Sequence, residues 1–212
     1  MKARILVFCR APVPGEAKTR LIPALGADGA ARLQAELVPD TVQRAVAAGV
    51  GPVELWAAGD DSTGLLAKVA ADHAVVRRTQ SGRDLGERMH AALAAGDGGP
   101  AIVIGTDCPA LMPAVIAAAA AALARNDAVV VPALDGGYVL LGMHDPPAAL
   151  FDGIPWGTET VLQATRERLL ALGWRWHELP ALPDVDVPAD LDRLATLSPA
   201  WRSRVAALRE GS

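Results

Sequence analysis

The sequence predicts a single α/β domain, a three-layer sandwich in which helices cover both faces of a mixed, mostly parallel sheet. Short apolar runs alternate with longer stretches of helical character along the whole chain of 212 residues, which is typical of this fold class. The runs at residues 5–7 and 102–104 are continuously apolar, as strands covered on both sides are. No linker or repeat divides the chain, so we expect one domain over residues 1–212.

The apolar runs give the strands and the stretches between them give the helices. We expect strands at residues 3–8, 53–57, 74–77, 101–105, 128–132, 138–143 and 174–179. We expect helices at residues 30–48, 62–71, 85–95, 113–124, 158–172, 188–194 and 199–209. The alanine run inside the fourth helix needs no special function, because alanine is the strongest helix former.

Composition excludes several classes of protein. The formal net charge is −4, so no broad basic face is available for nucleic acid. No stretch reaches 18 unbroken apolar residues, which argues against a membrane span. The apolar run after the first residues is too short for a signal peptide. Only Cys9 and Cys108 occur, and we expect both as reduced, buried thiols in a cytoplasmic protein. Nothing in the sequence indicates an oligomeric state.

The loop after the first predicted strand concentrates positive charge. In "FCRAPVPGEAKTRL" three cations, Arg10, Lys18 and Arg20, surround a bend at Gly15. A Walker A loop needs a glycine immediately before the lysine, and Ala17 stands there. The remaining pattern suits the charges of a di- or triphosphate. In the alternative interpretation the two arginines pair with surface carboxylates and the prolines only shape a turn.

Asp107 follows the fourth predicted strand in "IGTDCPAL". A carboxylate at the end of a buried strand is unfavourable unless it is solvated, hydrogen-bonded or bound to a metal. Mg²⁺ or Mn²⁺ held by one or two carboxylates and by substrate phosphates is a common arrangement. Alternatively, Thr106 or Asp107 caps the helix that follows. The segment alone leaves both interpretations open.

A second acidic segment, "LPDVDVPADLDRL", lies near the end of the chain. Asp184 and Asp186 stand in its extended part, and either is a candidate to complete a cation site, although turns use such residues equally often. We expect Asp190 and Asp192 to lie within the next helix and to face solvent.

Two glycine-containing segments are ambiguous. In "LDGGYVLLG", Asp135 precedes two glycines that permit positive φ or close approach of a ligand, but a plain hairpin turn would look the same. In "QSGRDLGERMH", Gly82, Arg83 and Asp84 precede a helix. Asp84 and Glu87 would be favourable at a helix start in any protein.

The order of six segments carries a resemblance to a known family. The segments are "FCRAPVPGEAKTRL", "QSGRDLGERM", "IGTDCPAL", "LDGGYVLLG", "IPWGTETV" and "DVDVPADL". They resemble the bacterial glycosyltransferase-A-type enzymes that accompany radical-SAM/selenodomain proteins, often labelled arsenosugar biosynthesis glycosyltransferases. That family is similar in fold to nucleotide-diphospho-sugar transferases and to nucleotidyltransferases such as 2-phospholactate guanylyltransferase.

The resemblance implies roles for individual residues. Lys18, Arg20 and Asp107 would act in catalysis, and Asp107 and Asp186 would hold one Mg²⁺ or Mn²⁺ ion. The implied nucleotide-binding residues are Arg10, Gly15, Lys18, Arg20, Gly82, Arg83 and Asp84. The chain departs from related patterns in having Val187 where threonine is usual and Cys108 where many sugar transferases have a second aspartate.

The implied reaction is transfer from a nucleotide-activated donor to a small-molecule acceptor. With a nucleoside-diphosphate sugar the chain would transfer the sugar. With a nucleoside triphosphate it would transfer a nucleotidyl group to an acceptor phosphate and release pyrophosphate. The family label favours the sugar, whereas the three cations of the first loop match a triphosphate better. A non-catalytic nucleotide-binding regulatory module is the third alternative.

Overall fold

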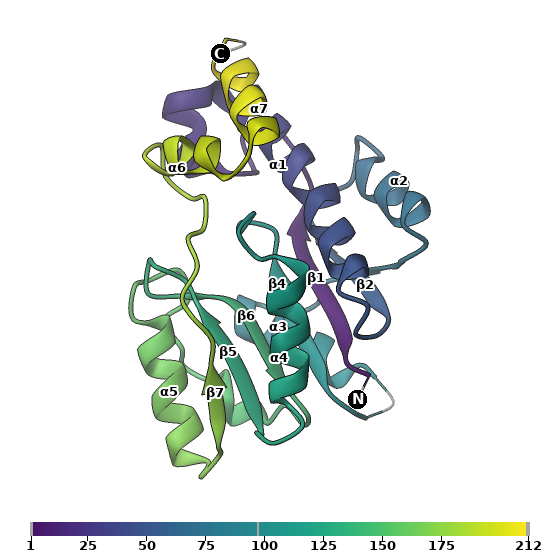
Figure 1. Ribbon diagram of the computed structural model, residues 1–212, viewed down its shortest axis with the longest axis vertical. Coiled ribbons are helices and arrows are strands. Elements are labelled where there is room, and N and C mark those ends of the chain that lie inside the picture. Colours follow the sequence, from purple (N-terminus) through teal and green to yellow (C-terminus); the bar gives the residue numbers. More distant parts are fainter. Residues whose placement is uncertain (1, 97, 211–212) are drawn as a thin grey trace.

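A seven-stranded sheet forms the centre of the molecule in the computed structural model, which describes residues 2–96 and 98–210 (Figure 1). Its strands are β1 (Arg4–Arg10), β2 (Val53–Ala58), β3 (Val76–Thr79), β4 (Ala101–Gly105), β5 (Ala128–Pro132), β6 (Tyr138–Met143) and β7 (Trp176–Glu178). Their order is β3-β2-β1-β4-β6-β5-β7. Only β6 runs antiparallel to its neighbours. The predicted mixed, mostly parallel sheet is confirmed.

The helices follow the predicted order. They are α1 (Ile22–Ala47), α2 (Leu65–Asp72), α3 (Leu85–Ala94), α4 (Pro113–Ala122), α5 (Val161–Ala171), α6 (Asp190–Leu197) and α7 (Pro199–Glu210), with two 3-10 turns, η1 (Thr19–Leu21) and η2 (Ala148–Leu150). The first helix begins at Ile22 rather than at the expected residue 30. Among the described residues, no helix combines the length and apolar character needed to cross a bilayer.

Successive side chains of β1 enter opposite layers of the fold, as the alternation of a strand requires. Ile5 and Val7 belong to a core that also contains buried side chains of α1, α2 and α4. Leu6 and Phe8 belong to a second core, which includes buried side chains of α3 and α5. The continuous apolar run at residues 5–7 is therefore covered on both faces, and the predicted three-layer arrangement is confirmed.

A third apolar cluster lies away from the sheet and was not predicted. We call it the helical module (residues 19–37 and 185–210), because it joins η1 and the first half of α1 to α6 and α7. Figure 1 shows these helices together at one end of the molecule, reached from β7 by an extended segment. Leu25, Leu33 and Leu37 are fully buried there, and Trp201 is 3% exposed. The module places the residues that flank α1 and α6 beside the end of the sheet.

Gly26 makes the early start of α1 possible. Its backbone has φ 66° and ψ 170°, which breaks the helical geometry inside α1. This region of φ/ψ space is essentially restricted to glycine. The kink turns the first helical residues so that Leu21 and Leu25 pack in the same cluster as Leu33 and Leu37. The glycine thus reads as a helix boundary in the sequence although both sides of it are helical.

Replacing Gly26 is expected to destabilise the protein. Gly26→Asn should lower the free energy of unfolding by about 1–3 kcal/mol, because a side chain is strained at this backbone geometry. Urea denaturation followed by tryptophan fluorescence would measure the loss. Gly64→Asn is the matched control: Gly64 has φ 68° and ψ 5°, in the left-handed region that asparagine tolerates. Equal losses for the two variants would contradict the role given to the kink.

Candidate functional site

The carboxyl ends of the parallel strands open into a cleft of about 640 Å³. It lies at the switch point of the sheet, where β2 leaves β1 on one side and β4 joins it on the other, the usual position for ligands in open α/β sheets. Because β6 is antiparallel, its first residue, Tyr138, also lines this edge. The cleft brings together six predicted or candidate residues: Arg10, Lys18, Arg20, Asp107, Asp184 and Asp186.

Lys18 lies at the centre of the charged part of the cleft. Its ammonium nitrogen is 2.8 Å from Oδ1 of Asp107 and 3.3 Å from Oδ1 of Asp186. It also donates a hydrogen bond of 2.6 Å to the carbonyl of Val185. The side chain is only 5% exposed, and its backbone adopts the left-handed conformation (φ 50°, ψ 42°) just before η1. One buried cation therefore joins the first loop, the loop after β4 and the segment before α6.

The two arginines of the first loop lie nearer to solvent. Nη1 of Arg20 is 3.3 Å from Oδ2 of Asp186, and the Arg20 side chain is 59% exposed. Arg10 donates an exposed hydrogen bond of 3.4 Å to the carbonyl of Glu16. Arg20 thus pairs with a carboxylate, as the alternative interpretation had it, but that carboxylate lines the cleft. The guanidinium of Arg20 remains accessible to an anion there.

Asp107 does not cap the following helix. The residue that precedes α4 is Met112, and no side chain caps that helix. The Asp107 carboxylate is instead 46% exposed in the cleft and accepts a 3.3 Å hydrogen bond from Thr106. Its own carbonyl accepts a hydrogen bond from the amide of Val185 at 2.8 Å. The cap interpretation is therefore wrong, and the backbone of this loop fixes the segment that carries Asp184 and Asp186.

A buried glutamine on α1 is hydrogen-bonded to the loop that carries Asp107. Gln34, on α1, is 3% exposed and donates hydrogen bonds to the carbonyl of Arg10 (3.1 Å) and to the hydroxyl of Thr106 (3.3 Å). Since Thr106 donates to Asp107, a chain of hydrogen bonds runs from α1 to the carboxylate. The sequence analysis missed Gln34. The signal was a polar residue four positions before Val38, on the apolar face of a helix.

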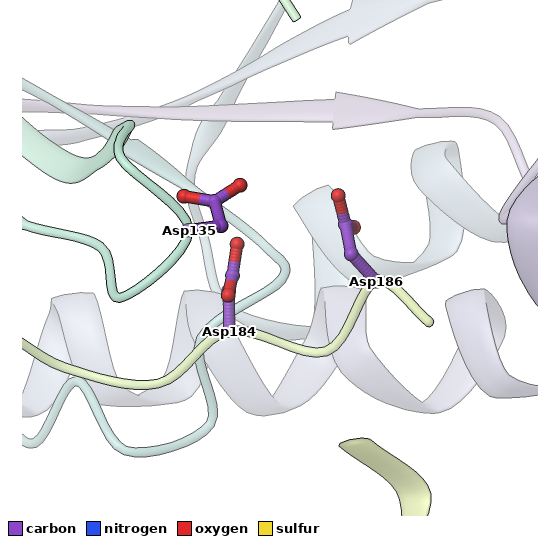
Figure 2. Close-up of side chains that lie close together, drawn as sticks. All are labelled: Asp135, Asp184 and Asp186. Atoms are coloured by element: carbon purple, nitrogen blue, oxygen red, sulfur yellow. The ribbon is translucent and has the colours of Figure 1, made fainter. Parts of the chain in front are cut away.

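Three carboxylates converge beside the cleft, and two of them, Asp184 and Asp186, line it. One oxygen each from Asp135, Asp184 and Asp186 lies within 4.8 Å of the others. Figure 2 shows Asp184 and Asp186 projecting from the same side of one extended segment, with Asp135 facing them from another loop. Burial, together with the charges of Asp135 and Asp186, raises the pKa of Asp184 to about 6. The fold holds these like charges together at some cost in stability.

The expected solvent-facing position of Asp190 is wrong. We expected it to face solvent, but it is only 8% exposed. Its Oδ2 accepts hydrogen bonds from the amides of Asp186 (2.9 Å) and Val187 (2.8 Å). The carboxylate thereby fixes the turn that carries Asp186, a local arrangement typical of aspartate in turns. Asp192, by contrast, has a side chain that is 78% exposed and pairs with Arg209, as expected of a solvent-facing residue.

Gly82, Arg83 and Asp84 do not line the cleft. Arg83 is 90% exposed and pairs with Glu87, and Asp84 accepts a hydrogen bond from the Glu87 amide as the N-cap of α3. Arg83 and Asp84 border a separate shallow hollow. Gly15 adopts φ 81° in the first loop, next to Glu16, which does line the cleft. The capping role considered for Asp84 is confirmed.

Two further polar residues of the cleft belong to the candidate segment "QSGRDLGERMH" but were not singled out in it. Gln80 donates hydrogen bonds to the carbonyls of Cys9 (3.1 Å) and Trp56 (2.9 Å), which ties together the ends of β1 and β2. Arg88, on α3, donates to the carbonyl of Gly82 at 3.1 Å. Both line the cleft. The partners of Gln80 are backbone carbonyls from distant parts of the chain, so no local pattern in the sequence marks that residue, whereas Arg88 bonds within its own segment.

The two cysteines are not reactive thiols. Cys9 and Cys108 are 4% and 3% exposed, and burial raises the pKa of each to about 12. A protonated thiol is a poor nucleophile and a poor metal ligand. The expectation that they act as small buried hydrophobes is confirmed.

The carboxylates of the cleft fit a hard divalent cation. Asp107 and Asp186 direct their Oδ1 atoms at one point, which the Lys18 ammonium marks. Carboxylate oxygens are the protein ligands that Mg²⁺ and Mn²⁺ prefer. Asp135 and Asp184 stand close enough to contribute further oxygens. The donor set is therefore suitable in chemistry and in charge.

The raised pKa of Asp184 predicts that the stability of the protein depends on pH. Because the pKa of Asp184 in the folded protein, about 6, lies above its ordinary value, its ionisation opposes folding as the pH rises through that value. Asp184→Asn should therefore have a higher melting temperature than the unmodified protein at about pH 8, and the difference should vanish towards about pH 4. Asp192→Asn, in an exposed pair, is the control. A destabilised Asp184→Asn at high pH would contradict this account.

Solved structures of other proteins share the fold of this chain. The chain is 34% identical to a protein from Desulfovibrio desulfuricans G20 that is provisionally named a nucleotide-diphospho-sugar transferase; the match has a TM-score of 0.84 and covers 99% of this chain and 95% of that one. CMP:2-keto-3-deoxy-manno-octonic acid synthetase complexed with CTP is 14% identical, with a TM-score of 0.58 and coverage of 99% and 100%.

A third solved structure is glucosyl-3-phosphoglycerate synthase from Mycobacterium tuberculosis in complex with Mn²⁺, UDP and glucosyl-3-phosphoglycerate. It is 12% identical, with a TM-score of 0.55 and coverage of 99% and 80%. At such low identity the second and third likenesses show the fold alone. The expected nucleotide-diphospho-sugar transferase-like fold is confirmed.

No curated protein matches the chain in sequence. A family model described as "Uncharacterized protein conserved in bacteria (DUF2064)" matches residues 41–158, which includes the loop that carries Asp107. Together with the extent of the match to the Desulfovibrio protein, this shows that the chain belongs to the DUF2064 family.

Proposed function

We propose that the protein is a metal-dependent transferase that moves a sugar from a nucleoside-diphosphate sugar to a small-molecule acceptor. The observation that carries this proposal is the joint placement of Lys18, Arg20, Asp107 and Asp186 in one cleft at the switch point of the sheet. Cations in such a cleft suit a diphosphate, and carboxylates beside them suit the divalent ion that accompanies it.

The chain's own residues supply most of what the reaction requires. When the sugar leaves, negative charge develops on the diphosphate, and preorganised cations stabilise such charge in a partly water-excluded site. Arg20, with its exposed guanidinium, is placed to contact a phosphate from the solvent side. Gln34 and Thr106 orient Asp107, while Asp190 orients the turn of Asp186. A Mg²⁺ or Mn²⁺ ion held by Asp107 and Asp186 would neutralise the departing diphosphate.

The relatives support sugar transfer ahead of nucleotidyl transfer. The protein that shares 34% identity is provisionally named a nucleotide-diphospho-sugar transferase, and the resemblance to the arsenosugar-associated enzymes agrees with it. A specific observation favours the second candidate: the fold is shared with a synthetase that binds CTP, and the first loop carries three cations. A nucleoside triphosphate as donor would then release pyrophosphate.

A panel of donors should identify the reaction class. A ligand that binds only the folded state adds about 2.7 kcal/mol at a hundredfold excess over its Kd, which raises the melting temperature of a domain of this size by roughly 5–10 °C. We expect such a shift with one nucleoside-diphosphate sugar and Mg²⁺ or Mn²⁺, and little shift after chelation. A shift with triphosphates alone would favour nucleotidyl transfer. No shift with any nucleotide would overturn the proposed function.

Turnover separates an enzyme from a regulatory module. Incubation of the stabilising donor with candidate acceptors should release nucleoside diphosphate, or pyrophosphate for the second candidate. A module that only senses nucleotide would bind the donor and release neither product.

Asp107→Asn should abolish the cation-dependent part of donor binding. The side chain keeps its size but loses the charge that a hard cation needs, and its exposed position leaves the core unchanged. The expected result is a thermal shift with donor that no longer responds to Mg²⁺. Asp192→Asn, outside the cleft, should behave like the unmodified protein. A full Mg²⁺ response in Asp107→Asn would remove Asp107 from the proposed cation site.

Arg20→Ala should weaken binding of diphosphate-bearing ligands by about tenfold or more, because one charge-assisted hydrogen bond is worth roughly 1.5–3 kcal/mol. Binding of the nucleoside without phosphates should not change. Arg209→Ala is a matched control, since Arg209 also forms a partly exposed pair with an aspartate of the helical module. Calorimetric titration of both variants would test this. Equal losses for nucleoside and nucleotide would mean that Arg20 does not contact phosphate.

A further inference from the structure

The Lys18 ammonium is already engaged by three oxygen atoms of the protein, two through hydrogen bonds and one through an ion pair. An ammonium group donates three hydrogen bonds, and three acceptors surround this one: Oδ1 of Asp107, Oδ1 of Asp186 and the carbonyl of Val185. The side chain is 5% exposed, so solvent hardly reaches it. Lys18 can contact a donor phosphate only after it leaves these partners.

The same point is the one at which a divalent cation would bind. Asp107 and Asp186 are the carboxylates proposed to hold it, and both already bind the ammonium. A divalent cation bound at these oxygens would lie within a few ångströms of the ammonium, and the two positive charges would repel each other. The backbone of Lys18 is also held in the left-handed conformation (φ 50°), which is unfavourable for a side-chain-bearing residue.

We propose that Lys18 is an internal counter-ion that occupies the cation site of the empty enzyme and is released towards the donor phosphates when the divalent cation binds. The proposal rests on the proposed function, because it takes Asp107 and Asp186 as the cation ligands. Its consequence is that cation and donor bind together. The ion alone must displace Lys18 into solvent without a new partner, whereas in the presence of a donor the freed ammonium gains a phosphate.

We call this exchange of Lys18 for a divalent cation the interlock. The affinity of the protein for Mn²⁺ alone tests it. Lys18→Met keeps the length of the side chain and removes its charge. It should bind Mn²⁺ about tenfold more tightly than the unmodified protein, as judged by the electron paramagnetic resonance signal of free Mn²⁺, since the competing charge-assisted bonds are gone. The gain should disappear in the double variant Lys18→Met with Asp107→Asn. Lys68→Met, which removes an equal charge from an exposed ion pair outside the cleft, should change Mn²⁺ affinity by less than about threefold.

Two results would overturn the proposal. One is a Lys18→Met variant that binds Mn²⁺ no more tightly than the unmodified protein, including the case in which neither binds it at millimolar concentration. The other is a tighter binding that persists without the Asp107 carboxylate. Circular dichroism would first establish that the variant is folded.

A second measurement uses the unmodified protein and so does not depend on a variant that folds. The chain has only three lysines, Lys2, Lys18 and Lys68. Amine-selective acetylation read by mass spectrometry should label Lys68, whose side chain is 69% exposed, much faster than Lys18. Mn²⁺ above its Kd should raise labelling of Lys18 by about fivefold or more and leave Lys68 unchanged, because a released ammonium becomes accessible. Unchanged labelling of Lys18 would overturn the proposal.

The proposed function and the interlock fail in different ways. Both interlock measurements use the metal alone, without nucleotide. If no nucleotide stabilises the protein, the transferase assignment fails even when Lys18→Met binds Mn²⁺ more tightly. If donor and Mg²⁺ stabilise the protein but Lys18→Met shows no gain for Mn²⁺, only the interlock fails.

Discussion

The ammonium of Lys18 balances a concentration of negative charge that the fold would otherwise have to bear. Asp107, Asp135, Asp184 and Asp186 all lie at one edge of the sheet, where the ends of several strands bring their loops together. Without a cation between them, such carboxylates repel one another. The lysine also joins three chain segments far apart in sequence, so that the sheet and the helical module meet at a charged contact.

Much of this arrangement could be predicted from the sequence. The continuous apolar runs of β1 and β4 fixed the central strands, and the rule that ligands bind beyond the carboxyl ends of parallel strands pointed to Lys18 and Asp107. The acidic segment near the end of the chain made both Asp184 and Asp186 candidates, and a resemblance to related enzymes singled out Asp186. The structure places Lys18 in contact with both Asp107 and Asp186.

The rest depends on contacts that no local pattern records. Gln34 and Gln80 find backbone and side-chain partners more than 20 residues away, and Asp190 is buried because its carboxylate folds back on the preceding turn. The first helix was expected to begin at residue 30, whereas tertiary packing of Leu21 and Leu25 favours a kinked helix that begins at Ile22. Arg83 shared the loop composition of a phosphate site, but its neighbour four residues on satisfies its charge.

The turn between β5 and β6 is fixed at its ends and at its middle. Pro132 and Tyr138 are paired in the sheet, and a methyl group on Gly136 would overlap the backbone carbonyl of Glu159. Between these fixed points the side chain of Leu134 is 61% exposed, whereas Asp135 faces Asp184 and Asp186. Loops on a rigid scaffold tolerate change that the scaffold does not. The side chain of Leu134 can thus diverge among descendants of one ancestral gene while every strand keeps its register.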